Sequence, residues 1–311
     1  MKGHYLALVD ESNEIKAGLP LFEVKSWLTG KRLVSIPFAT FSDPLVSNAE
    51  EFYCLLDRVK HMHKELKFAY TEIRMFKFDA GRFDHEGINQ DLFKAHLLTL
   101  AGSMEDLKMT FHKTCVRKNI GRANRNRLKL RVGDTEEDWI ALYRLYVANR
   151  KRLGLPSHPY AFIRNIWQTF REEERVRLLL AEWEEKVIGA LVLFKYKDRV
   201  SAEYLGTDQK YMGLYTNVFL FWEAIKWAFE SKVDYFDFGR TSPKNHGLME
   251  FKGHWGTRVI DLPIYYFPEE AGRHKSDRDH SLPYKAIRSL CKVSPESTHP
   301  LMGRLIYKHL G

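Results

Sequence analysis

Apolar and polar positions alternate along much of the first hundred residues, with the period of half-buried β-strands. Residues 4–38 contain three such runs, the first two joined by an Asp/Ser/Asn turn and the third ending before Pro37. This pattern predicts a β-meander. Residues 47–67 change to helical spacing, with Ser47 or Asn48 as the N-cap, and two further strands are predicted at 69–78 and 92–100.

The same order of elements recurs in the second half of the chain. Residues 176–208 read as three strands, residues 216–231 as a helix, and residues 233–240 as a closing strand. The helix is apolar on most faces and too short to span a bilayer, so we expect it in a core. A hairpin, helix, strand order in both halves predicts an α/β chain, α+β in the stricter sense. Each of its two similar lobes would be a mixed, mostly antiparallel sheet flanked by helices.

The run YFDFGRTSPKNHGLMEFKGHWG, residues 235–256, is where the apolar pattern gives way to polar residues. Phe236 and Phe238 alternate with Asp237 and Gly239 as in a strand, and a polar, glycine-punctuated loop is predicted to follow. Loops that follow rigid strands often carry reacting groups. An ordinary strand with a solvated loop fits the composition equally well.

The composition sets the size and the charge of the protein. With 311 residues, 44% apolar, the chain is long enough for two domains. The formal charge of +9 and a pI near 9.2 favour an anionic partner such as RNA, a phosphorylated substrate or an acidic membrane surface.

Several classes of site find no support in the sequence. Cys54, Cys115 and Cys291 are far apart, with no CxxC or Cys/His spacing, so neither a disulfide framework nor a zinc site is predicted, and a reducing cytoplasm fits best. We find no GxGxxG after a strand, no Walker sequence, no HExxH and no GxSxG, so no metal or cofactor is expected. No apolar run is long enough for a membrane span, which leaves a soluble protein or one at the periphery of a membrane.

A basic segment joins the two predicted lobes. No acidic residue lies between Asp106 and Asp134, a stretch with nine lysines and arginines. If the stretch is helical, Lys118, Arg122 and Arg125 share one face, where like charges destabilise the helix unless an anion compensates. We therefore expect an anionic ligand here, with a solvated linker helix as the alternative.

Two further features bear on domain organisation and binding. Tyr70, Glu72 and Arg74 alternate along a predicted strand and so share a face, as an ion pair or as the lining of a cleft. After Phe267 the chain becomes polar and turn-like, and residues 282–310 predict two short basic amphipathic helices. The predicted domains are residues 1–112, residues 113–268 with the basic segment, and a helical tail at 269–311.

The hairpin, helix, strand order resembles the acetyltransferase superfamily that includes the GNAT enzymes. Those enzymes hold the acetyl-CoA pyrophosphate with an Arg/Gln-x-x-Gly-x-Gly/Ala turn at a helix N-terminus, where free amides face the anion. The corresponding stretch here runs from Lys210 to Tyr215, and only Gly213 fits the motif. Tyr215 replaces the small residue that permits close approach, which argues against acetyl-CoA as the donor.

Motifs along nearly the whole chain resemble the FemAB family, the tandem-GNAT aminoacyl transferases of bacterial envelope synthesis. Within that family the chain looks most like the branch associated with exosortase and exopolysaccharide loci. The motifs that carry the resemblance are FDFGR at 236–240, Gly247-Leu248, Phe251-Lys252, Trp255-Gly256, Tyr70–Arg74, RKNIGRAN at 117–124 and KRLGLPSHPYAFIRNIW at 151–167. By this resemblance the chain begins at the second or third element of the first lobe, so we expect an abbreviated lobe or a truncated N-terminus.

The resemblance implies amide formation, in which an amine of a peptidoglycan or exopolysaccharide precursor attacks the ester of an aminoacyl-tRNA without a metal. It implies catalytic roles for Lys252, as an electrostatic stabiliser, and for Phe251 and Arg240. The residues expected to bind the precursor are Tyr70, Glu72, Arg74, Tyr160, Lys244 and His246. The residues expected to bind RNA or phosphate are Arg117, Lys118, Arg122 and Arg125.

Two alternatives to this function stay open on the sequence. One is a GNAT-like N-acyltransferase that uses acyl-CoA, and the other is a non-catalytic module that binds RNA or anionic lipid. The expected location is the cytoplasm, with peripheral contact at the inner membrane left open.

Overall fold

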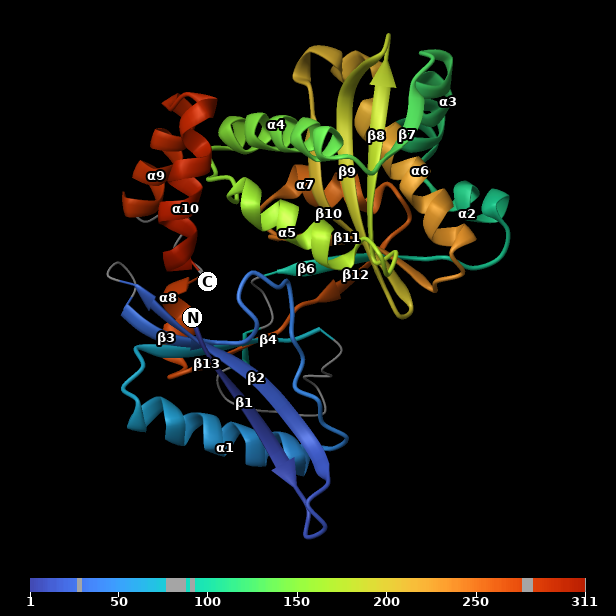
Figure 1. Cartoon of the computed structure of the whole chain (residues 1–311). Helices are drawn as coiled ribbons and strands as arrows, with labels where there is room; N and C mark the ends of the chain where they lie inside the picture. Colours follow the sequence, from blue (N-terminus) through green and yellow to red (C-terminus); the bar gives the residue numbers. More distant parts are fainter. Residues whose placement is uncertain (27–29, 77–87, 90–92, 276–281, 311) are drawn as a thin grey trace. The chain divides into compact units, whose positions relative to one another are not determined.

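The computed structural model describes residues 1–26, 30–76, 88–89, 93–275 and 282–310. It divides into two compact units, each with its own sheet. The first unit comprises residues 1–94, 261–285 and 305–311, and the second comprises residues 95–260 and 286–304. Figure 1 shows the elements of both units along the chain.

The first unit is built on a six-stranded sheet with the order β1-β2-β3-β4-β13-β5. Its elements are β1 (Lys2–Val9), β2 (Ile15–Ser26), β3 (Gly30–Val34), α1 (Ala49–Glu65), β4 (Tyr70–Arg74), β5 (Ile88–Asn89), β13 (Ile264–Phe267) and α8 (Glu270–Lys275). The first three strands pair antiparallel, which confirms the predicted meander. Helix α1 begins after Asn48, whose side chain accepts a hydrogen bond from the amide of Glu51 at 3.0 Å, as one of the two predicted caps.

The second unit is built on a seven-stranded sheet with the order β12-β6-β11-β10-β9-β8-β7. Its strands are β6 (Lys94–Thr99), β7 (Lys129–Gly133), β8 (Val176–Trp183), β9 (Lys186–Tyr196), β10 (Arg199–Thr207), β11 (Tyr235–Thr241) and β12 (Arg258–Asp261). Its α-helices include α2 (Met104–Thr110), α3 (Lys118–Arg125), α4 (Glu136–Leu153), α5 (Tyr160–Phe170), α6 (Thr216–Glu230) and α7 (His246–Gly253). A π-helix, η1 (Lys113–Arg117), leads into α3, and a 3₁₀ segment, η2 (Gln209–Leu214), precedes α6.

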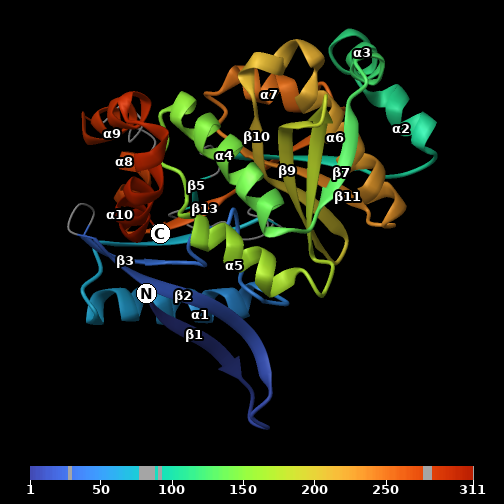
Figure 2. The ribbon, with the colours of Figure 1, turned by 45° about the horizontal axis from the view of Figure 1, so that its top comes forward.

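Helices cover both faces of the second sheet, as Figure 2 shows for α4 and α5 on one face and α6 on the other. The strands follow the alternation of the sequence, since Leu178 and Leu180 of β8 pack with α4 and α5 while Leu179 and Ala181 pack with α6. The second core also contains Phe236 and Phe238 of β11. Asp237, which points to the opposite face, is also buried, so a strand buried on both faces carries the candidate site.

Both units contain a meander, a helix and a parallel strand beside the meander. In the first unit β4 pairs parallel to β3 after α1, and in the second β11 pairs parallel to β10 after α6. The predicted fold class, with two GNAT-like lobes of mixed sheet and flanking helices, is confirmed.

Three details differ from the sequence predictions. The compact units do not follow the predicted boundaries at 112 and 268, because β6 joins the second sheet and β13 returns to pair with β4. The loop predicted after β11 contains α7, which starts at Asn245, whose side chain accepts from the amide of Leu248. The segment after Phe267, predicted to be turn-like, includes α8. The two predicted tail helices are present, as α9 (Leu282–Val293) and α10 (His299–Leu310). Residues 77–78 and 92 of the predicted strands lie outside the described residues.

No helix within the described residues combines the length and the apolar character that a membrane crossing needs.

Candidate active site

The candidate active site lies where β10 and β11 stop pairing. Among the described residues, the two strands pair only at Arg199–Ser201 with Tyr235–Asp237. The register of β10 against β9 shifts between Ala202 and Tyr204, so Glu203 sits in a bulge. Gly239 of β11 has a φ of +75°, a conformation that glycine adopts without a side-chain clash. The ends of both strands are therefore irregular at the same level of the sheet.

Lys252 of α7 binds the irregular end of β11. Its Nζ donates hydrogen bonds to the carbonyl oxygens of Gly239 at 2.8 Å and Arg240 at 3.3 Å. In a regular strand consecutive carbonyls point to opposite edges, but here two successive ones reach a single ammonium. Since an ammonium has three donors, one remains for a carboxylate or a ligand.

Burial and two carboxylates set the charge of Lys252, which is only 6% exposed. Burial lowers the pKa of Lys252 to about 8, while Asp237 and Glu203 act in the opposite direction. The lysine is thus mostly charged at neutral pH and titrates within reach of physiological conditions. Groups with such values are common in catalytic sites.

Asp237 is the buried counterpart of this lysine. Its carboxylate accepts a hydrogen bond from the Gly239 amide at 2.7 Å and lies 3.5 Å from Nη1 of Arg199. Burial raises the pKa of Asp237, against the effects of the Gly239 amide, Arg199 and Lys252. Asp237 therefore stabilises the backbone conformation at Gly239 and places a negative charge near the ammonium of Lys252.

Glu203 is the exposed carboxylate of the group. It accepts a hydrogen bond from Ser201 Oγ at 2.8 Å. Desolvation of the carboxylate, together with the charge of Asp237, raises the pKa of Glu203, against the Ser201 hydrogen bond and the charges of Arg240 and Lys252. A carboxylate in a bulge, open to solvent and close to a buried cation, can take a proton from a bound amine.

A neutral histidine supports the other side of α7. His96 of β6 is fully buried, and burial, followed by Lys252, lowers its pKa to about 4. Its Nε2 lies 3.3 Å from Sδ of Met249, and its Nδ1 lies 3.4 Å from Oγ1 of Thr257. Thr257 in turn donates to the carbonyl of Lys252 at 3.1 Å. These contacts hold the helix that presents Lys252.

The other two residues predicted as catalytic occupy different environments from Lys252. The Phe251 ring packs on the core, with its centroid 5.7 Å from that of Phe221. Arg240 is exposed at the end of β11 and acts electrostatically on Glu203. Lys244 and His246, predicted to bind substrate, are exposed just before and at the start of α7.

The predicted precursor-binding strand belongs to the first unit. Tyr70 and Glu72 are buried, and Arg74 Nε donates to Glu72 at 2.8 Å and Nη1 to the carbonyl of Ala39 at 2.9 Å. Of the two alternatives for this strand, the ion pair is formed. Tyr160, in the second unit, donates its hydroxyl to Glu136 at 2.8 Å at the start of α5.

The basic segment forms the predicted helix only in part. Lys118, Arg122 and Arg125 lie on α3 with exposed side chains, while Ile120 and Ala123 face the core. Arg117 ends the preceding π-helix and donates to Sδ of Met109 at 2.9 Å.

The start of α6 lies beside this basic helix. Arg122 donates to the Tyr215 hydroxyl at 3.0 Å, with its guanidinium carbon 5.5 Å from the ring centroid. Tyr215 is the N-cap of α6, with a φ of +62° and no side-chain hydrogen bond to the helix. The first amides of α6 thus lack a side-chain cap and can face an anion. The turn before them nevertheless departs from the GNAT glycine motif.

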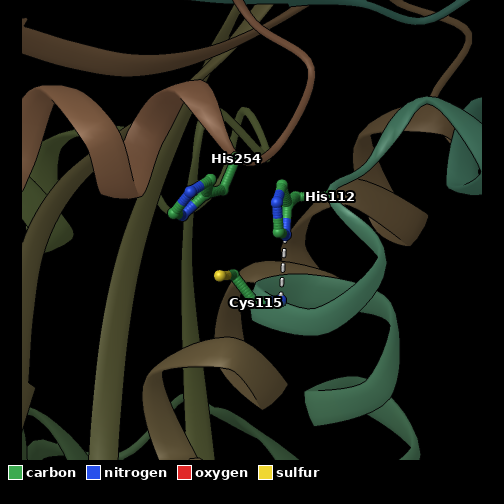
Figure 3. Close-up of side chains that lie close together, drawn as sticks. All are labelled: His112, Cys115 and His254. Atoms are coloured by element: carbon green, nitrogen blue, oxygen red, sulfur yellow. Dashed lines mark hydrogen bonds between the residues drawn. The ribbon is translucent and has the colours of Figure 1, made fainter.

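Sequence reasoning missed two groups. Glu203 was overlooked because only strand pairing reveals its bulge. His112 and Cys115 lie beside His254, with their donor atoms all within 4.8 Å of one another (Figure 3). The expectation that the cysteines have no Cys/His spacing was wrong at this point, since His112-x-x-Cys115 is such a spacing; the third residue, His254, is distant in the sequence.

Comparison with known proteins bears on the fold. Residues 112–253 match the family model for the acetyltransferase (GNAT) domain. The FemX crystal structure is similar with a TM-score of 0.67 at 14% identity, covering 85% of this chain and 87% of that one. No curated protein sequence matches the chain.

Two further structures share this fold. The C-terminal domain (DUF2156) of a putative lysylphosphatidylglycerol synthetase from Agrobacterium fabrum gives a TM-score of 0.58 at 11% identity, covering 88% of each chain. A tandem GNAT protein from the clavulanic acid biosynthesis pathway gives 0.52 at 9% identity, covering 85% of this chain and 82% of that one. The resemblance to the FemAB family is confirmed at the level of the tandem GNAT fold.

Proposed function

We propose that this chain, with its GNAT domain at residues 112–253, transfers an aminoacyl group from aminoacyl-tRNA to an amine of a cell-envelope precursor. The acceptor would be a peptidoglycan or exopolysaccharide precursor, in keeping with the exosortase-associated branch that the sequence resembles. The observation that carries the proposal is the buried ammonium of Lys252 at the divergent ends of β10 and β11, with the open carboxylate of Glu203 nearby.

The reaction forms one bond and breaks one bond at the acyl carbon. The amine nitrogen attacks the ester carbonyl, the C–N bond forms, and the carbonyl oxygen takes the negative charge. The bond to the ribose oxygen of the tRNA then breaks, and that oxygen takes up a proton. Glu203 accepts the proton that the amine loses and passes it to the ribose oxygen, and Lys252 stabilises the oxyanion or the leaving oxygen electrostatically. Arg240, at the same strand end, adds positive charge for an anionic substrate.

The name of one similar protein supports an aminoacyl donor. One similar structure, with a TM-score of 0.58, is named as a domain of a putative lysylphosphatidylglycerol synthetase, and that name joins an amino acid to a membrane lipid. The exposed basic face of α3 offers cations to the phosphates of a tRNA, through Lys118, Arg122 and Arg125. A protein with these substrates works in the cytoplasm, at the inner face of the membrane that carries the precursor.

A donor screen tests the proposal. Purified protein is given charged tRNA or acyl-CoA with a candidate amine, and the product is detected by mass. We expect product with charged tRNA, and a turnover about 100-fold lower in both Glu203→Gln and Lys252→Ala. Lys292→Ala, an exposed lysine of α9, serves as the matched control. Wild-type turnover in both site variants would overturn the assigned roles.

A second candidate donor, acyl-CoA, is favoured by one observation. The N-terminus of α6 has no side-chain cap, and a Cβ at Gly213 would meet nothing within 4 Å, so an anionic group has access to the turn. Saturable binding of CoA in calorimetry, weakened by Lys210→Ala, would favour this donor. Absence of CoA binding leaves the aminoacyl ester.

The non-catalytic alternative makes a different prediction from either enzyme. A binding module would hold RNA or anionic lipid with a steep salt dependence and yield no product with any donor. Product formation with either donor therefore excludes it.

A further inference from the structure

The side chains of His112, Cys115 and His254 meet on the second unit, outside the Lys252 group (Figure 3). His112 is the N-cap of the π-helix η1, Cys115 lies within that helix, and His254 is the residue after α7. The one ligand atom that each residue offers lies within 4.8 Å of the other two. Within the described residues, this is the group of histidine, cysteine and acidic side chains close enough to hold a metal ion.

The backbone already holds the two segments together without a metal. The amide of His112 donates to the carbonyl of His254 at 2.7 Å, and the two imidazole rings have centroids 4.6 Å apart. Trp255, the next residue, is fully buried with its ring 5.3 Å from that of Phe111. Phe111 and Trp255, which adjoin the cluster, are thus anchored in the core. The core therefore fixes the backbone from which the three side chains extend.

The donor set selects the metal. Two imidazoles and one thiolate suit zinc, whereas magnesium and calcium need oxygen ligands. In a tetrahedral zinc site with bonds of about 2.0–2.3 Å, neighbouring donors lie about 3.3–3.6 Å apart. The observed separation of up to 4.8 Å needs a closure of about 1 Å, which rotation of the exposed Cys115 and His112 side chains supplies.

We propose that His112, Cys115 and His254 bind one zinc ion, which ties the start of the basic helical segment to the end of the helix that carries Lys252. This assignment is separate from the proposed transfer reaction and does not depend on it. Three protein ligands leave the fourth tetrahedral position to water or another ligand.

Two neighbouring groups adjust the site. Nδ1 of His112 accepts a hydrogen bond of 3.2 Å from the Cys115 amide and lies 3.3 Å from Oγ1 of Thr114, and these contacts fix the orientation of the ring. Glu250 Oε1 lies 3.6 Å from Nε2 of His254, where a carboxylate can orient a metal-bound histidine.

Metal binding to the purified full-length chain tests this proposal. After dialysis against a chelator, titration with Zn²⁺ in a calorimeter should give one tight site per chain. Cys115→Ser and His254→Ala should each weaken binding about 100-fold or more. The matched controls are Cys54→Ser and His61→Ala, an exposed cysteine and an exposed histidine of α1, which should bind as the wild type does.

Spectroscopy with Co²⁺ gives a readout that does not depend on affinity alone. The cobalt-loaded wild type should show a thiolate-to-cobalt charge-transfer band that Cys115→Ser loses and Cys54→Ser keeps. Circular dichroism of each variant in chelator establishes that it is folded. Wild-type affinity in both site variants, or a cobalt spectrum without the thiolate band, would overturn the assignment.

Discussion

Lys252 Nζ donates to the carbonyl oxygen of Gly239 at 2.8 Å, across the gap between a helix and the strand end that precedes it in the chain. The same ammonium also reaches the Arg240 carbonyl and is nearly enclosed by protein. Lys252 therefore has two roles. It donates hydrogen bonds to two carbonyl oxygens at the end of β11, and it places a positive charge beside Asp237 and Glu203. One substitution removes both.

The charge of Lys252 predicts a falling limb in the pH dependence of activity. Its pKa is lowered to about 8, so the ammonium is lost as the pH rises through that value. If the protonated form stabilises the transition state, kcat/KM should fall about tenfold per pH unit above pH 8. The pH profile of Lys252→Arg should extend to higher pH, because a guanidinium stays charged there. If kcat/KM of the arginine variant falls above pH 8 as it does in the wild type, another group is responsible for the pH dependence.

Burial of neutral His96 predicts a loss of stability in acid. Its pKa is lowered from 6.5 to about 4, so the unfolded chain binds a proton between these values that the folded chain does not. The free energy of unfolding therefore has its full value above pH 6.5. It decreases by about 2–3 kcal/mol as the pH falls towards 4. Urea unfolding at pH 7 and pH 4.5 should show a smaller difference in His96→Gln than in the wild type. His61→Gln, exposed on α1, should behave as the wild type.

The buried pair of Glu72 and Arg74 predicts a large effect on the stability of the first unit. Their side chains are 7% and 13% exposed, and their bond is 2.8 Å long. Glu72→Gln should destabilise that unit by about 3–5 kcal/mol, because it leaves the buried guanidinium without its carboxylate. Denaturant unfolding measures the loss. A loss below about 1 kcal/mol would show that the pair is not structural and would favour a substrate role for Glu72.

The exposed face of α3 predicts salt-dependent binding of tRNA. Lys118→Ala and Arg125→Ala should each weaken binding and reduce the slope of log affinity against log salt by about 1. Filter binding over a range of salt concentrations measures both quantities. Lys292→Ala on α9 changes the net charge equally and should leave the slope as it is. Equal effects of all three variants would mean that only net charge matters, not the α3 face.

The sequence predicted the elements well where the physical signal is local. Alternation marked the meander and the strands at 176–208, and helical spacing marked α1 and α6, because burial of one face or one stripe imposes the period directly. The helix α7 was missed because its eight residues include two glycines and only one of the eight is buried, and because its start depends on the Asn245 cap.

The candidate site was predictable in part. Lys252 and Arg240 were named from motifs, and the structure places both at the end of β11. Phe251 was named with them, yet its ring packs against Phe221, because successive residues of a helix face different directions. The role of Glu203 could not be inferred, since its bulge exists only in the pairing of β10 with β9.

The sequence by itself determined the periodic elements, the basic segment and the repeated order of both halves, since these depend on neighbours along the chain. Only the tertiary structure decided that β13 completes the first sheet, that Lys252 is enclosed beside Asp237, and that His254 lies against His112 and Cys115. The physical reason is that burial, strand pairing and donor geometry arise between residues far apart in sequence. No local pattern specifies their distances.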